Sequence, residues 1–298
     1  MATSSFDQTE GHSLLERWKI VLLLSPALVI IAGLFLGGLI LGLIGSLGYM
    51  PLLGREEFNL NAYRNILASE RFYLSFLLTF YIAFTSTVIA SLLAIGAALI
   101  LRRSFIGRSV INFLFQINLT VPHLVGAVGI LYLFSQSGFF ARLAYEFEII
   151  TKPSEFPALI YDPLAIGIIL QYVWKEVPFI GLILLANMQT IGRDYEAAAR
   201  VLGASRWQCF RHVLLPLLFP GLLAAAMIVF AFTFGAYEIP ALLGQNYPSA
   251  LPVLAYQAFT DVDLNARPEA LAMGMIIALL SVIMIFGYAH LARRYVRS

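Results

Sequence analysis

The stretch YEAAARVLGASRWQCFRHVLLP, residues 195–216, is conspicuously polar and lies between two long apolar segments. Its alanine-rich first half favours a helix, on which Glu196 and Arg200 are four residues apart and can pair. Gly203 can end that helix, because glycine readily adopts the left-handed conformation that closes many helices. Ser205 can then cap a second, short helix. The stretch therefore predicts two short helices joined by a bend.

The second short helix is expected to have an apolar edge. Trp207, Phe210 and Leu214 follow one another at spacings of three and four residues, which brings them onto one helical face. Proline interrupts the helical hydrogen-bond ladder, so Pro216 is expected to end this helix one turn into the next apolar run. A polar helical stretch with an apolar edge indicates a surface outside the membrane that meets another molecule.

The composition places the rest of the chain in a membrane. Of its 298 residues, 60% are hydrophobic and 12% are charged, which is more apolar surface than one soluble core can bury. A helix needs about 20 apolar residues to cross a bilayer, and continuous apolar runs favour helices over barrel strands. We expect an all-α integral membrane protein with six transmembrane helices, at 20–44, 72–101, 111–134, 164–188, 213–234 and 270–291.

The basic residues predict the orientation. With six spans both chain ends lie on one side, which holds twelve Lys and Arg residues against six on the other. The richer side is expected to be cytoplasmic. Its basic residues are Arg17, Lys19, Arg102, Arg103, Arg108, Arg193, Arg200, Arg206, Arg211, Arg293, Arg294 and Arg297. The chain, 1–298, is then one transmembrane domain with a cytoplasmic tail at 1–19, core spans within 72–291 and a cytoplasmic loop at 193–212.

The stretch 195–216 resembles the EAA loop of the permease subunits of binding-protein-dependent ABC importers. The pattern of that loop is E-A-A, three residues, G, nine residues, I, one residue, L-P. The positions that match with the spacing intact are Ala198, Ala199, Gly203, Val213, Leu215 and Pro216. The glutamate departs from the pattern. Its expected place is Ala197, while Glu196 lies one residue earlier, about 100° around a helix.

The resemblance implies a type I ABC importer permease fold, with a cytoplasmic coupling helix between the fourth and fifth spans. It implies a subunit that spans a bacterial inner membrane, is surrounded by lipid and forms the translocation pathway. This subunit would couple closure of the ATPase to alternating access of that pathway. Its implied partners are an ATPase subunit dimer, a second permease subunit in a heterodimer and an extracytoplasmic substrate-binding protein; nucleic acid is not among them. The implied coupling residues are Glu196, Ala198, Ala199, Arg200, Gly203, Ala204, Trp207, Arg211 and Pro216.

The chain is not expected to be an enzyme. It contains no G-x-x-x-x-G-K-[ST] loop to hold nucleotide phosphates. The resemblance implies that ATP and Mg bind to the partner ATPase, and no cofactor or metal is expected on this chain.

Polar residues inside the apolar spans are candidates for the substrate pathway. A charged pair in a span costs several kcal/mol unless it is buried, paired or hydrated, and Pro122 predicts a broken helix that lines a cavity. The candidates are Asn118, Thr120 and His123 in the third span, Gln171, Trp174, Lys175 and Glu176 in the fourth, and Tyr237 and Glu238 at the end of the fifth.

Each candidate has an ordinary alternative role. Lys175 and Glu176 can extend to the membrane surface, and His123 can be a packed, hydrogen-bonded histidine. The aromatic residues can be interfacial anchors, and Glu238 can lie at a solvated helix end.

The substrate is predicted from charge and from a closer resemblance. The outer side has eleven acidic residues against six basic ones, which favours a cationic solute or partner. The third and fourth spans and the segment FGAYEIPALLG, residues 234–244, look most like polyamine-type permeases, and a spermidine- or putrescine-like cation is expected. Permeases for sulfate, ferric iron, thiamine or phosphonate are alternatives, as is an ion-coupled secondary transporter that uses charges such as Glu176.

Overall fold

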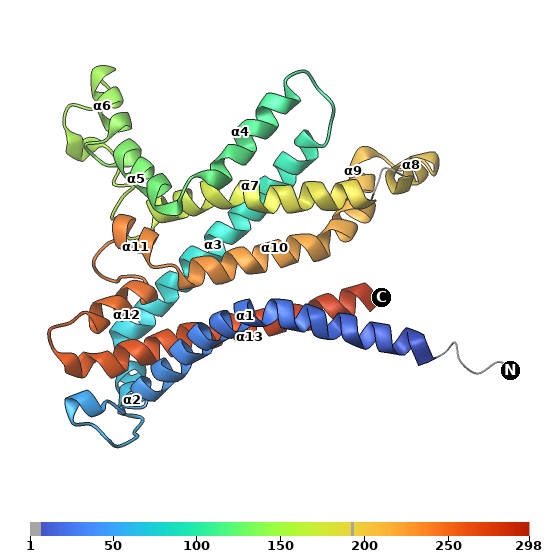
Figure 1. Cartoon of the computed structure of the whole chain (residues 1–298). Coiled ribbons are helices and arrows are strands. Elements are labelled where there is room, and N and C mark those ends of the chain that lie inside the picture. Colours follow the sequence, from blue (N-terminus) through green and yellow to red (C-terminus); the bar gives the residue numbers. More distant parts are fainter. Residues whose placement is uncertain (1–6, 192–193, 298) are drawn as a thin grey trace.

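The computed structural model describes residues 7–191 and 194–297, and these fold into helices joined by loops (Figure 1). Residues 1–6 of the tail and Arg193 of the loop lie outside the described residues. The long helices are α1 Asp7–Ser46, α3 Glu70–Leu101, α4 Arg108–Thr120, α5 His123–Phe134, α7 Ile166–Ile191, α10 Leu215–Gly235 and α13 Arg267–Arg297. The shorter ones are α2 Asn61–Ala68, α6 Phe139–Glu146, α8 Asp194–Val201, α9 Arg206–Cys209, α11 Glu238–Leu243 and α12 Leu251–Phe259.

Six stretches of helix among the described residues are long and apolar enough to cross a membrane, as the sequence predicts. The predicted third span at 111–134 is wrong, because α4 and α5 meet at a sharp bend (Figure 1) and the stretch long enough to cross a membrane is His123–Glu146. Val121 between them is extended, with φ −72° and ψ 124°. Pro122 explains this, since proline keeps the preceding residue out of the helical conformation. The predicted break is therefore present.

The centre of the bundle is built from α3, α7 and α10. Ala90, Ala94 and Ala98 form a buried stripe on α3 that packs with Leu184 of α7 and Leu218 of α10. Small side chains let the backbones of membrane helices approach closely, which favours association through packing. By contrast, α1 lies along α13, and none of the residues in its most apolar window is buried. This chain therefore leaves most of the apolar stretch of α1 uncovered.

The two ends of the bundle carry different elements. The beginning of α1, the end of α13 and the helices α8 and α9 lie at one end, which we call the α8 end (Figure 1). The short helices α2, α6, α11 and α12 lie at the opposite end, which we call the α12 end. The polar stretch 195–216 thus lies at the same end of the bundle as the beginning of α1 and the end of α13. Six crossings require this arrangement.

Candidate functional site

The turn between α8 and α9 has the predicted geometry. Gly203 has φ +86°, and its amide donates to the carbonyl oxygen of Arg200 at 2.9 Å. The amide of Ala204 donates to the carbonyl oxygen of Ala199 at 3.0 Å, so the turn satisfies the last carbonyls of α8. Ser205 caps α9 in a reciprocal capping box with Gln208. Both sequence predictions for this turn are confirmed.

The second helix is not short, and the expectation that Pro216 ends it is wrong. Helix runs from Arg206 to Gly235, because a π turn at Phe210–Leu214 joins α9 to α10. In that turn the amide of Leu215 donates to the carbonyl oxygen of Phe210, five residues earlier. The wider turn gives room to the ring of Pro216, which in a regular helix would clash with the carbonyl four residues earlier. The loop is therefore continuous with the fifth span.

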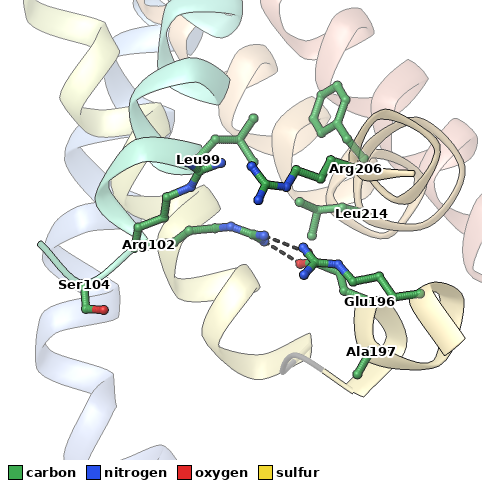
Figure 2. A pocket seen from close by; sticks show the side chains of 10 residues that line it. Leu99, Arg102, Ser104, Glu196, Ala197, Arg206 and Leu214 are labelled. Carbon is green, nitrogen blue, oxygen red and sulfur yellow. Dashed lines mark hydrogen bonds and ion pairs between the residues drawn. The ribbon is translucent and has the colours of Figure 1, made fainter. Parts of the chain in front are cut away.

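Glu196 attaches α8 to the end of α3. Its carboxylate accepts two hydrogen bonds from the guanidinium of Arg102, at 2.6 and 2.8 Å (Figure 2). Hydrogen bonding to Glu196 raises the pKa of Arg102, because it favours the charged guanidinium over the neutral form. The predicted partner was Arg200, four residues away, whereas the partner here is 94 positions away in sequence. The displaced acid thus faces the bundle.

Apolar side chains project from the tip of this loop. Val201 and Leu202, which the sequence reasoning missed, are 87% and 88% exposed, and Trp207 is 64% exposed. The other predicted coupling residues divide by exposure. Ala198, Arg200, Gly203, Arg211 and Pro216 are exposed, and Glu196, Ala199 and Ala204 are half-buried. The missed signal was that two apolar residues precede a helix-ending glycine, which places them at a turn.

The bend between α4 and α5 brings most of the predicted pathway residues together. The ammonium of Lys175 donates to the carbonyl oxygens of Asn118 and Val121. The side-chain amide of Asn118 donates to the carbonyl oxygen of Trp174 at 2.6 Å. Carbonyls at the end of a helix have no partner within it, so the ammonium provides what the broken ladder lacks. Lys175 is 3% exposed and therefore does not extend to the membrane surface.

A negatively charged side chain, that of Glu176, lies at the other side of the bend. Glu176, 6% exposed, lies with its carboxylate 3.3 Å from Nε2 of His123, the first residue of α5. The amide of Gln171 donates to the carbonyl oxygen of His123 at 3.1 Å, and the ring of Phe232 in α10 lies 4.9 Å from the histidine ring. A cation thus meets the carboxyl end of α4 and an anion the amino end of α5, as the helix dipoles favour.

Three candidates lie outside this cluster. Thr120 is exposed, and its hydroxyl donates to the carbonyl oxygen of Ile117 within α4. The ring of Tyr237 packs against that of Tyr256 in a tilted arrangement, with 4.5 Å between ring centroids, and Glu238, the first residue of α11, is exposed. Both Tyr237 and Glu238 therefore lie where the fifth span ends, towards the α12 end.

Comparisons with known proteins agree with this architecture. The family model described as "Binding-protein-dependent transport system inner membrane component" matches residues 90–297. The sulfate transport system permease protein CysT of Salmonella typhimurium is 25% identical over 236 residues, which cover 79% of this chain and 82% of CysT. The molybdenum transport system permease protein ModB of Mycobacterium bovis is 28% identical over 217 residues, 71% of this chain and 76% of ModB.

A solved structure shares the fold over nearly the whole chain. A chain from the crystal structure of a bacterial ABC transporter involved in the import of the acidic polysaccharide alginate has a TM-score of 0.78 and 19% identity. The similarity covers 96% of this chain and 99% of that one. The fold is therefore that of a type I ABC importer permease. Because the family model matches well over half of the chain, this protein belongs to the family of binding-protein-dependent transport system inner membrane components.

Proposed function

We propose that this chain forms half of the translocation pathway of an ATP-driven importer and receives the force of ATP hydrolysis at the α8 end. One observation carries the proposal: an exposed apolar tip, Val201, Leu202 and Trp207, stands at the turn between α8 and α9, and the helix that begins there at Arg206 continues unbroken into a membrane span. Exposed apolar residues outside lipid mark a surface that another protein covers. A rigid helix joined to that surface can transmit a displacement of the surface into the bundle.

The proposal assigns each end of the bundle a partner. The α8 end is cytoplasmic and meets one subunit of an ATPase dimer, which binds ATP and Mg. The α12 end faces outward and receives a substrate-loaded binding protein. A second, different permease subunit completes the pathway, to which the cluster around Lys175 and Glu176 contributes from this chain. Uptake that continued on a proton gradient after removal of the ATPase would instead establish a secondary transporter.

A charge placed on the tip tests the docking role. We expect Leu202→Glu to weaken ATPase binding about thirtyfold, since a central apolar contact of a protein interface is worth about 2 kcal/mol. Binding of the purified ATPase to the reconstituted chain measures this directly. The control is Ile106→Glu, a change of an equally exposed apolar residue in the neighbouring loop between α3 and α4. Equal losses in both variants, or none in Leu202→Glu, would refute the assignment.

The substrate has two candidates, each with one supporting observation. The residues that line a cleft of about 850 Å³ at the α12 end include four acids, Glu56, Glu57, Asp263 and Glu269, and one base, Arg55. A surface with this excess of acids attracts cations. This supports the organic cation, a spermidine- or putrescine-like polyamine. The names of the relatives do not support it, since CysT and ModB are permeases for sulfate and molybdenum. They support an oxyanion such as sulfate.

One measurement separates the two candidates. The assembly, purified with its ATPase and binding protein, is given spermidine, putrescine or sulfate, and ATP hydrolysis is followed. A several-fold stimulation by the polyamines alone supports the cation, and stimulation by sulfate alone supports the oxyanion. Ferric iron, thiamine and phosphonate complete the panel, because the family resemblance includes permeases for them. Stimulation by one of these would reject both candidates.

A further inference from the structure

A basic cleft lies beneath the polar stretch 195–216, which we call the coupling loop. It has a volume of about 610 Å³ and lies between the end of α3, the residues that follow it, and α8 with the start of the following helix (Figure 2). Four arginines and one acid are among the residues that line it: Arg102, Arg103, Arg200, Arg206 and Glu196. Because Glu196 pairs with Arg102, the other three guanidinium groups give the cleft an excess of positive charge.

No other acid neutralises those three groups within the part of the chain that the structure describes. The ion pairs found there are Arg102 with Glu196, His123 with Glu176, and Lys152 with Glu155. Arg103, Arg200 and Arg206 are all exposed, so their donors are available to a ligand. Guanidinium groups bind phosphate oxygens in a bidentate manner, which makes a phosphate-bearing anion the chemistry that this lining fits.

The inner wall of the cleft is apolar. Leu99, Phe210 and Leu214 line it, and Leu99 belongs to the last turn of the membrane span α3. Close by in the chain, the side chains of Ile100 and Ile106 are exposed, by 61% and 104%. Exposed apolar residues on both sides of the arginine pair at 102 and 103 indicate that this segment lies at the surface of the bilayer. A free anion would leave the apolar wall in water, whereas an amphiphile would cover it.

We propose that this cleft binds the headgroup of an anionic phospholipid from the leaflet at the α8 end. Arg103, Arg200 and Arg206 contact the phosphate, and the acyl chains lie along the apolar wall towards α3. Such a lipid bridges α3 and α8 beside the Arg102–Glu196 pair and so holds the coupling loop against the bundle. The proposal depends neither on the transported solute nor on the partner ATPase.

Lipid retention tests the site. The purified chain in detergent is mixed with phosphatidylglycerol or zwitterionic phosphatidylcholine, and bound lipid is counted by native mass spectrometry. We expect selective retention of phosphatidylglycerol, reduced about twenty-fivefold in the double variant Arg103→Gln, Arg206→Gln, since each basic residue at an anionic surface contributes about fivefold. A photoactivatable phosphatidylglycerol should cross-link to residues 99–106 and 200–214. The control removes two exposed arginines at the α12 end, Arg64→Gln and Arg71→Gln, and should change retention less than twofold.

Three outcomes would overturn the proposal. Equal retention by the wild type and the double variant would show that the arginines do not form the site. Displacement of the lipid by millimolar inorganic phosphate would identify the occupant as a free anion. Unchanged lipid retention with weaker ATPase binding in the double variant would assign the cleft to the partner protein. A further variant, Arg103→Lys with Arg206→Lys, keeps the charge and should recover part of the retention, which separates lipid binding from misfolding.

Discussion

The Gly203→Pro variant is expected to insert into the membrane normally but to lose transport and substrate-stimulated ATP hydrolysis by about a hundredfold. Gly203 has φ +86°, which the proline ring cannot adopt, and its amide hydrogen bond to Arg200 would also be lost. A local cost of about 3 kcal/mol shifts the population of the docking conformation by about this factor. Uptake in proteoliposomes, with protease protection to verify insertion, measures the effect.

Two further changes at Gly203 isolate the backbone as the cause. A Cβ atom there would meet open space, so a clash contributes nothing to the result. Gly203→Asn should keep most of the activity, because asparagine tolerates the left-handed conformation. Gly203→Ala should lie between asparagine and proline, at a cost of about 1–2 kcal/mol. Normal ATPase binding and normal uptake in the proline variant would contradict the coupling role of the loop.

Lys175→Met should destabilise the folded chain by about 3 kcal/mol. Methionine has a similar length but no donor, so the carbonyl oxygens of Asn118 and Val121 would lose the ammonium that they share. The carbonyl of Asn118 would still accept from the amide of Val121 at 3.2 Å, but the part-buried carbonyl of Val121 would lose its donor. An acceptor left without a partner costs about 1–3 kcal/mol, and Glu176 would also lose the neighbouring cation. Thermal unfolding in detergent measures the change.

The matched control for this prediction is Lys152→Met. Lys152 pairs with Glu155 at 3.9 Å on an exposed surface, and such pairs contribute at most about 1 kcal/mol. Lys175→Arg keeps the charge and serves as a second comparison, since a guanidinium can still donate to both carbonyls. If Lys175→Met unfolded at the same temperature as the wild type, the ammonium would not be what stabilises the bend.

The parts of the fold that could be predicted are those set by local sequence. Six spans followed from hydrophobic length, and the turn at Gly203 and the cap at Ser205 followed from residues a few positions apart. The break at Pro122 was also predictable, because a proline affects its own neighbours. The angle of this break was not predictable, since the angle depends on how Lys175, from another helix, reaches the backbone carbonyls.

The incorrect predictions share one physical reason. In each case the structure depends on a group that is distant in sequence or on the conformation of the backbone. Glu196 was expected to act within its own helix, but its bidentate partner Arg102 comes from the end of α3. Pro216 was expected to end a helix, but the π turn that precedes it accommodates the proline within a continuous helix. Val201 and Leu202 were passed over because their exposure is a property of the tip as a whole.

The pair between Arg102 and Glu196 has a consequence for how a push at the tip would be shared. The start of α9 continues covalently into α10, and so a displacement there moves the fifth span as a stiff rod. The second span is reached from α8 through the ion pair between Arg102 and Glu196, which is reversible, unlike the covalent connection to the fifth span. A displacement of the loop is thus always transmitted to the fifth span. It is transmitted to the second span only while the charges of Arg102 and Glu196 stay in contact.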